Sequence, residues 1–200
     1  MKKIIGVIKK LINQPRLVYY YIQKSIRVPF LRSSLAKLIS ILNPPAKNIE
    51  LTQATQCYNE LESVGFSFTK GILTPEQVQD IKKYLLPLEC TEIRTSGRTT
   101  CRVSEGVPAS CRKLFYDAKT LTSCPHVLEL ANNPMLLATA EKHLGCRPTV
   151  SFITAWWSFP GVPEPGEQVY HDDMYHRDVE DYSFLKLFVY LTDVGDENGP

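Results

Sequence analysis

The first 48 residues of this 200-residue chain contain no aspartate or glutamate, although they hold ten lysine and arginine residues. Residues 49–200 therefore carry 13 basic and 21 acidic side chains, a formal charge of −8, while the whole chain has a formal charge of +2. This balance disfavours a uniformly basic protein that binds nucleic acid. The imbalance predicts two parts, a basic helical extension over residues 1–48, closed by Pro44 and Pro45, and an acidic body over residues 49–200.

Several other features are missing from the sequence. No apolar run approaches the roughly 20 residues that span a bilayer, and Lys9 and Lys10 interrupt the N-terminal run before it resembles a secretory signal. None of the six cysteines forms a Cys-x-x-Cys pair, which disfavours a structural zinc site, and a His-Glu-x-x-His pattern is missing too. These absences favour reduced, mostly buried thiols in a cytoplasmic protein.

The basic extension has apolar residues at helical spacing in two groups, over residues 4–12 and 28–42. Basic helices of this kind suit the surface of an anionic membrane or an acidic partner. They also suit packing against the acidic body of the same protein. The sequence therefore leaves peripheral membrane contact through residues 1–42 as one of two open interpretations.

The acidic body contains clear helix signals. Gly65 predicts the end of a helix that is followed by a short strand over residues 66–68. Thr74 and Gln77 have the spacing of a capping box, Pro75 suits the first helical position, and Pro87 predicts the end of this helix.

Further elements follow along the body. A helix is predicted from Asn133 to Gly145, and residues 91–112 are predicted to be a polar loop with short strands. Residues 149–158 and 185–192, which are rich in β-branched and aromatic side chains, predict two strands. Helices that precede strands favour an α+β fold with helices packed on an antiparallel sheet.

Metal-binding side chains gather between the two predicted strands. Residues 171–181 contain two His-x-Asp triplets, His171/Asp173 and His176/Asp178. On an extended segment alternate residues point the same way, so each triplet presents an imidazole and a carboxylate on one face. These two ligand types with a distant second histidine form the facial triad that holds Fe(II) and leaves positions open for other ligands. A solvated acidic loop is the other interpretation of this motif.

The region from residue 175 onward resembles the phytanoyl-CoA dioxygenase family. The resemblance lies in the His-Arg-Asp triplet 176–178, the strand-like segment 185–194 that ends in Leu-Thr-Asp-Val, and the Asn-Gly-Pro turn at residues 198–200. The Ala-Trp-Trp-Ser segment 155–158 and the Gly-Phe and Leu-Thr-Pro-Glu-Gln segments at 65–66 and 73–77 are also similar to family members. The resemblance spans roughly residues 55–200.

This resemblance implies N-terminal helices followed by part of a double-stranded β-helix, or jelly roll, that binds Fe(II), 2-oxoglutarate and O₂ and hydroxylates a small organic substrate. The family's first ligand pair maps onto His176 and Asp178. His171 and Asp173 are the alternative pair, and if they are not ligands they are expected to line the rim of the site. His126 and His143 are expected to have structural roles.

The resemblance also implies residues that this sequence does not contain. The family's third iron ligand and the basic residue that pairs with 2-oxoglutarate are expected beyond Pro200. We therefore expect a C-terminally truncated portion of the enzyme, with little or no turnover by residues 1–200 alone. Two other hypotheses stay open: a catalytically silent jelly-roll binding protein, and a membrane-surface or partner-docking protein that acts through the extension.

Overall fold

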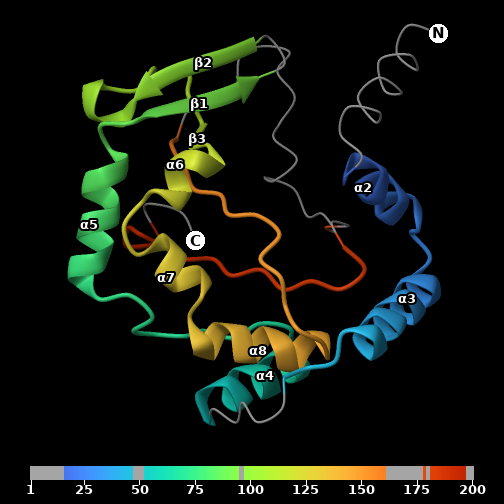
Figure 1. The fold of residues 1–200 in the computed structure, drawn as a ribbon. Helices are drawn as coiled ribbons and strands as arrows, with labels where there is room; N and C mark the ends of the chain where they lie inside the picture. The colour runs from blue at the N-terminus through green and yellow to red at the C-terminus, as the bar shows by residue number, and fades with distance from the viewer. Residues whose placement is uncertain (1–15, 47–51, 95–96, 161–177, 179–180, 197–200) are drawn as a thin grey trace, which may run out of the picture. The chain divides into compact units, whose positions relative to one another are not determined.

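The structure, a computed structural model, describes residues 16–46, 52–94, 97–160, 178 and 181–196 (Figure 1). Its helices are α2 (Arg16–Ser25), α3 (Pro29–Leu42), α4 (Thr52–Val64), α5 (Pro75–Leu85), α6 (Ala118–Thr122), α7 (Val127–Ala131) and α8 (Pro134–Leu144), with a 3₁₀ turn η1 (Val103–Glu105). Its strands are β1 (Glu89–Arg94), β2 (Gly97–Arg102), β3 (Lys113–Phe115) and β4 (Trp156–Ser158). The described fold thus mixes helices with a small sheet.

The chain divides into two compact units. The first contains α2, α3, α4, the larger part of α8 and residues 181–187, and the second contains α5, all four strands, α6, α7 and residues 188–196. Each unit is described separately below. Among the described residues, no helix combines the length and apolar character that a membrane crossing requires.

The sheet of the second unit has the strand order β2-β1-β3-β4, and all of its neighbouring strands are antiparallel. Figure 1 shows α5 leading into the β1–β2 hairpin. In this hairpin Cys90 lies opposite Cys101, and Arg94 lies opposite Gly97, whose φ of +145° suits a residue without a β-carbon. Short β3 and β4 are extended by two further backbone hydrogen bonds, from Tyr116 N to Ala155 O and from Phe159 N to Arg112 O.

The core of the second unit lies between α5, the sheet and α6. Its buried members are Ile81, Leu85, Cys90, Cys111, Leu114, Tyr116, Leu121 and Cys124. Trp157 and Leu191 pack against this cluster while keeping part of their surface exposed. Burial of these side chains is the main favourable term for the unit, because apolar area leaves water.

One buried hydroxyl connects three elements of this core. Tyr116 Oη donates a hydrogen bond to the carbonyl of Leu85 at 2.8 Å and accepts one from Trp157 Nε1 at 2.9 Å. Burial raises the pKa of Tyr116 to about 12, so the hydroxyl keeps its proton and acts as a donor at neutral pH. The end of α5, the residue after β3, and β4 therefore meet at a single oxygen atom.

The first unit is held together by polar contacts from α2 and α3. The buried Arg32 side chain donates from Nη1 to the carbonyl oxygens of Gln23 at 3.2 Å and Ile26 at 3.0 Å, and its guanidinium lies 5.7 Å from the ring centroid of Tyr182. Gln23 Nε2 donates to Asp181 Oδ1 at 3.0 Å. Residues near the N-terminus are thereby joined to residues 181–187.

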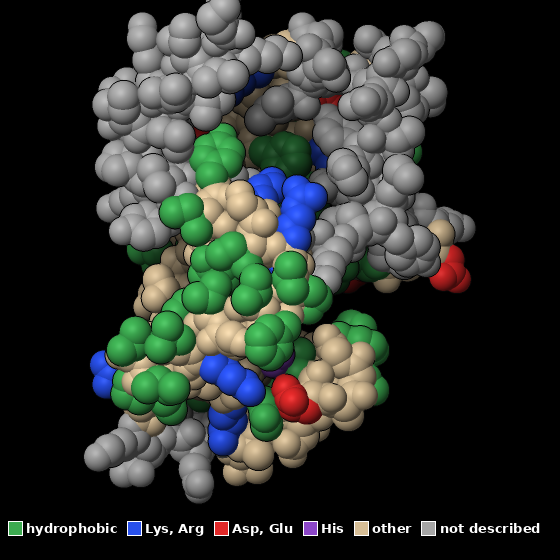
Figure 2. Space-filling view, turned by 90° about the vertical axis from the view of Figure 1, so that its right-hand side faces the viewer, with side chains coloured by type: hydrophobic (Ala, Val, Ile, Leu, Met, Phe, Trp, Pro, Cys, Tyr) green, Lys and Arg blue, Asp and Glu red, His purple; other side chains and the backbone are tan. Residues whose placement is uncertain are grey.

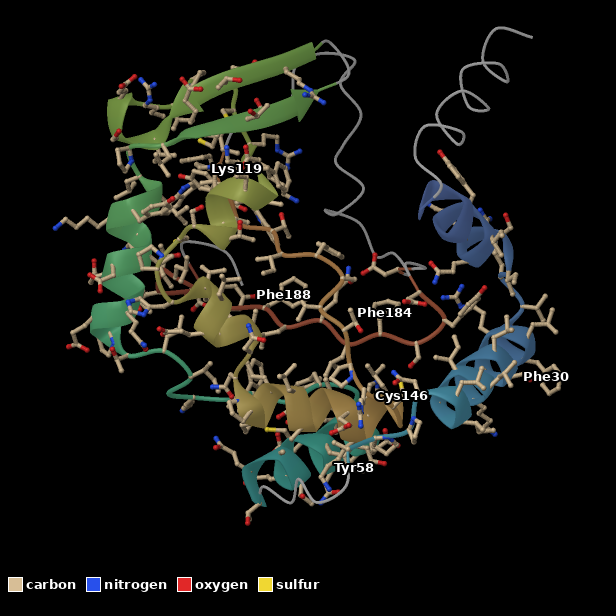
Figure 3. The ribbon with its side chains drawn as sticks, viewed as in Figure 1. Phe30, Tyr58, Lys119, Cys146, Phe184 and Phe188 are labelled. Carbon is tan, nitrogen blue, oxygen red and sulfur yellow. The ribbon has the colours of Figure 1, made fainter. Side chains whose placement is uncertain are left out.

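The α4 and α8 helices lie together in the same unit. His143 Nδ1 of α8 is 3.5 Å from Glu62 Oε1 of α4, and Figure 3, where Tyr58 marks α4, shows the two helices next to each other. The buried Glu141 of α8 accepts a hydrogen bond from the backbone of Ala46 at 2.6 Å. This contact gives the buried carboxylate a donor and connects α8 to the chain after α3.

Most predicted helices are confirmed. Thr74 and Gln77 form both hydrogen bonds of the capping box, at 3.3 Å and 2.9 Å, and α5 ends before Pro87. Gly65 and Gly145, with φ of +84° and +66°, follow the last residues of α4 and α8 as predicted. Residues 28–42 contain α3, and the polar segment 91–112 holds the short strands expected there. The apolar group at residues 4–12 lies outside the described residues.

Three strand predictions are wrong in whole or in part. Residues 66–68 form no strand, the long strand over residues 149–158 is reduced to β4, and the described residues of 185–192 form none. A strand needs a neighbour for its backbone hydrogen bonds, and no described strand pairs with these segments. Phe188 and Tyr190 are exposed as a result.

The order of the elements also differs from the prediction. Strands β1, β2 and β3 follow the first four described helices, as expected, but α6, α7 and α8 come between β3 and β4. A double-stranded β-helix is not seen in the described part of the chain, which contains a single four-stranded antiparallel sheet.

The capping box of α5 yields a stability prediction. Replacing Thr74 with Ala removes the acceptor of the Gln77 amide, and we expect unfolding to become easier by about 1 kcal/mol, measured by chemical denaturation. Thr74→Ser keeps the hydroxyl and is expected to restore most of the loss. Equal effects of the two variants would contradict the capping role.

The Tyr116 hydroxyl yields a second prediction. Tyr116→Phe removes the buried hydrogen bond to the Leu85 carbonyl and leaves the half-buried Trp157 indole without its acceptor, and we expect a loss of about 1–3 kcal/mol in the free energy of unfolding. Tyr84→Phe, at a residue packed against the same core, is the control and is expected to cost clearly less. Denaturation curves that fall together for the two variants would show that the hydroxyl bridge does not matter.

Candidate metal centre

Asp178 is the member of the predicted ligand set that the structure describes. Its Oδ2 atom accepts from Lys186 Nζ at 2.6 Å, and the two side chains are 33% and 30% exposed. Lys186 Nζ also lies 5.8 Å from the ring centroid of Phe184, which Figure 3 labels. The carboxylate is therefore partly shielded from water and paired with a cation.

Asp181, three residues after Asp178 in the sequence, accepts two hydrogen bonds. Asp181 Oδ1 accepts from the backbone amide of Tyr182 at 2.6 Å as well as from Gln23 Nε2. Asp181 therefore connects its segment to α2, whereas Asp178 pairs with Lys186. His176, His171 and Asp173 lie outside the described residues.

The other two histidines are engaged elsewhere. His126 lies 3.2 Å from Glu129 and 3.3 Å from Asp80. Hydrogen bonds to these two carboxylates raise the pKa of His126, and the bond to Glu129 contributes most. A raised pKa favours the imidazolium form, which cannot bind a metal ion. His143 faces Glu62, as described above. Both observations agree with the structural roles expected for these histidines.

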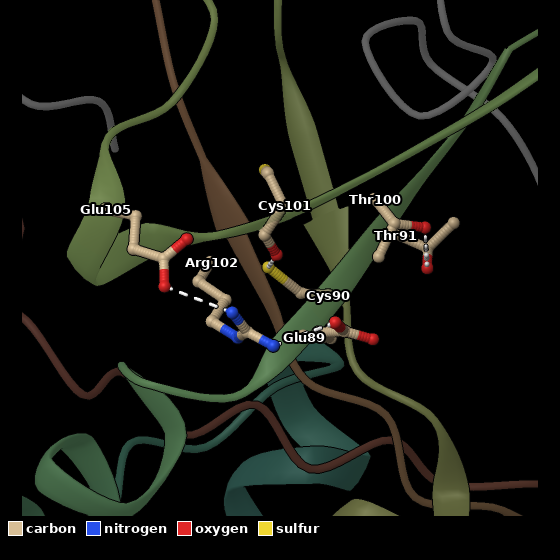
Figure 4. A network of polar contacts seen from close by, with 7 residues as sticks. All are labelled: Glu89, Cys90, Thr91, Thr100, Cys101, Arg102 and Glu105. Atoms are coloured by element: carbon tan, nitrogen blue, oxygen red, sulfur yellow. Dashed lines mark hydrogen bonds and ion pairs between the residues drawn. The ribbon is translucent and has the colours of Figure 1, made fainter.

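One arginine of the β1–β2 hairpin forms ion pairs within its own region of the fold. Arg102 binds Glu89 at 2.9 Å and Glu105 at 3.0 Å, and Figure 4 shows this network on the hairpin. The buried carboxylate of Glu92 accepts a hydrogen bond from the backbone of Arg112 at 2.8 Å. The sequence did not identify Glu92, because a charged residue within a strand pattern does not reveal which face it occupies.

The cysteines do not form a metal site. All six are free, and Cys57, Cys90, Cys111 and Cys124 are buried, as the sequence predicted. Burial raises the pKa of Cys90 to about 11, so its thiol stays protonated at neutral pH and donates to Cys101 O at 3.2 Å, as Figure 4 shows. Among the described residues, no group of three potential metal ligands is assembled.

The donor chemistry at Asp178 fits an Fe(II) ion. A carboxylate has two oxygens with about four acceptor positions, so the contact with Lys186 does not exhaust its capacity. Carboxylate oxygen with imidazole nitrogen is the donor set of non-haem Fe(II) sites. Sequence reasoning missed Lys186, although its place at the start of a mainly apolar segment, eight residues after the predicted ligand, was a usable signal.

Comparison with known proteins identifies the family. The model of the phytanoyl-CoA dioxygenase (PhyH) family matches residues 61–200. No curated protein and no solved structure matches the chain. Members of the family are typically 2-oxoglutarate-dependent dioxygenases that use Fe(II) and have a jelly-roll fold. Because the match covers well over half of the sequence, the chain belongs to the phytanoyl-CoA dioxygenase family.

Proposed function

We propose that the protein is an Fe(II)- and 2-oxoglutarate-dependent dioxygenase that hydroxylates a small organic substrate. The observation that carries this proposal is the family match over residues 61–200, which includes the His-Arg-Asp triplet at 176–178. The partly shielded carboxylate of Asp178 supports it, since an anionic oxygen donor is what an Fe(II) site requires there.

His176 and Asp178 are the residues proposed to hold the metal, through an imidazole nitrogen and a carboxylate oxygen. The pair His171 and Asp173 is the alternative, because it has the same His-x-Asp spacing. Binding requires the neutral imidazole and the ionised carboxylate. Lys186 holds the orientation of the Asp178 side chain by its 2.6 Å contact.

When bound, iron and 2-oxoglutarate supply the oxidising chemistry: one atom of O₂ enters a substrate C–H bond as a hydroxyl, and the other enters succinate as 2-oxoglutarate loses CO₂. The protein's own part is to bind the reactants next to each other and to exclude water from the reacting atoms.

The fold and domain arrangement belong to the same proposal. Residues 49–200 are proposed to belong to the jelly-roll domain of the family, and residues 1–48 to form a basic helical extension. The four-stranded antiparallel sheet is compatible with this assignment, since a jelly roll is built from antiparallel strands.

Removal of single ligands tests the metal assignment. We expect His176→Ala and Asp178→Ala each to weaken Mn(II) binding, a stand-in for Fe(II), by at least about tenfold in a calorimetric titration. His143→Ala is the matched control and is expected to leave Mn(II) binding unchanged.

Two outcomes would contradict this assignment. A loss of binding in His171→Ala with none in His176→Ala would move the ligand pair five residues toward the N-terminus. Mn(II) binding that none of His176→Ala, Asp178→Ala and His171→Ala weakens would contradict both ligand pairs.

Lys186 provides an independent test of the same site. Its ammonium group and a metal ion compete for the charge of Asp178, so Lys186→Met is expected to tighten Mn(II) binding by about tenfold at low ionic strength. Lys142→Met, in α8, removes the same charge elsewhere and is expected to have little effect. Weaker binding in Lys186→Met would mean that positioning of Asp178 outweighs the charge competition.

A further inference from the structure

An exposed apolar stripe runs along one side of α3. Phe30, Leu31, Leu38, Ile41 and Leu42 form this α3 stripe, and each is exposed, Phe30 and Leu42 to 76% and Ile41 to 75%. With 100° between successive helical residues, these five side chains fall within an arc of about 120°. Figure 3 shows Phe30 projecting outward from the helix. Five large apolar side chains are therefore exposed on one face of α3, two near its start and three near its end, with the exposed Ser34 between them. Exposed apolar surface of this extent marks an interaction site.

The polar contacts of α3 determine which side faces outward. Arg32, which falls outside that arc, is buried and binds the carbonyl oxygens of Gln23 and Ile26. At the other end of the helix, Asn43 Nδ2 donates to Arg147 O at 3.2 Å, and Arg147 N donates to Asn43 O at 3.3 Å. Because both ends are held within the unit, α3 cannot roll to bury the stripe without losing these bonds.

The charged side chains that α2, α3 and the turn between them contribute are all cationic. Three of these cations are exposed: Lys24 on α2, Arg27 on the turn after α2, and Lys37 on α3. No acidic residue occurs before Glu50 in the sequence. Figure 2 shows the side of the molecule on which α2 and α3 lie, with hydrophobic side chains gathered there and Lys and Arg side chains among them. An apolar helix face with Phe and Leu, bordered by cations, is the pattern of helices that lie in a membrane interface.

We propose that α2 and α3 bind the protein peripherally to an anionic lipid surface, with the α3 stripe entering the interface and Lys24, Arg27 and Lys37 facing the headgroups. Charge complementarity selects this occupant. A second copy of the chain would bring two basic surfaces together, whereas an anionic bilayer offers both an apolar layer and opposite charge. The α3 stripe contains none of the proposed metal ligands, and vesicle binding and Mn(II) binding test the two proposals separately.

Vesicle co-sedimentation of the full chain tests this assignment. Binding is expected to vesicles of phosphatidylcholine mixed with phosphatidylserine, to be much weaker to phosphatidylcholine alone, and to fall as salt is added. The double variant Phe30→Ser and Ile41→Ser is expected to bind at least about tenfold more weakly, because two large apolar side chains no longer leave water. Both positions are three-quarters exposed, so an unchanged circular dichroism spectrum is expected.

A matched control removes exposed apolar surface elsewhere. Phe66 and Phe68, an exposed pair with ring centroids 5.4 Å apart, are replaced by Ser, and this variant is expected to bind vesicles like the unaltered chain. An equal loss of binding in the control would show that the effect is not specific to the α3 stripe and would overturn the proposal.

Three other results would also overturn it. The first is no binding of the unaltered chain to anionic vesicles, as expected if the stripe is covered by the protein's own acidic body. The second is vesicle binding that the Phe30→Ser and Ile41→Ser variant retains in full. The third is a dimer in light scattering without lipid that this variant dissociates, which would assign the stripe to a second copy of the chain.

Discussion

One buried hydroxyl joins three elements of the second unit. A helix ends with carbonyl groups that lack partners within the helix, and the Leu85 carbonyl at the end of α5 is one of them. This carbonyl accepts from the Leu88 amide at 3.0 Å and from the Tyr116 hydroxyl, whose oxygen in turn accepts from the half-buried Trp157 indole. Because β3 also pairs with β1 and β4, this contact relates α5 to the sheet and closes the core around Leu85 and Leu114.

The first unit uses a buried cation for a comparable purpose. Arg32 satisfies carbonyl oxygens at the end of α2 and lies against Tyr182, and Gln23 reaches Asp181. These contacts join helices of the basic extension to the segment that follows the proposed metal ligands. Asp181 lies three residues after Asp178 in the sequence. The same contacts direct the apolar side of α3 away from the unit.

One part of the candidate site follows from a sequence motif, and another part follows only from contacts in the folded chain. The His-x-Asp spacing predicted Asp178 as a metal ligand, and the family match includes this residue and its neighbours in the sequence. Both inferences depend on residues that follow one another along the chain. The pairing of Asp178 with Lys186 depends on the path of the chain between them. Likewise, Trp157 was recognised as an aromatic near a strand, but its place against the core and its bond to Tyr116 required the folded chain.

Local signals were sufficient for the helices and insufficient for the sheet. The sequence by itself determined the α5 capping box, the glycine ends of α4 and α8, the charge contrast and the family, because each depends on residues a few positions apart or on a linear pattern. Only the tertiary structure decided which β-branched segments become strands, since Leu187 and Val189 carry a strand pattern but lack a described partner. It also decided which face of α3 is exposed and which cation accompanies Asp178. Those outcomes require partners that are distant in the chain, and composition and periodicity do not identify such partners.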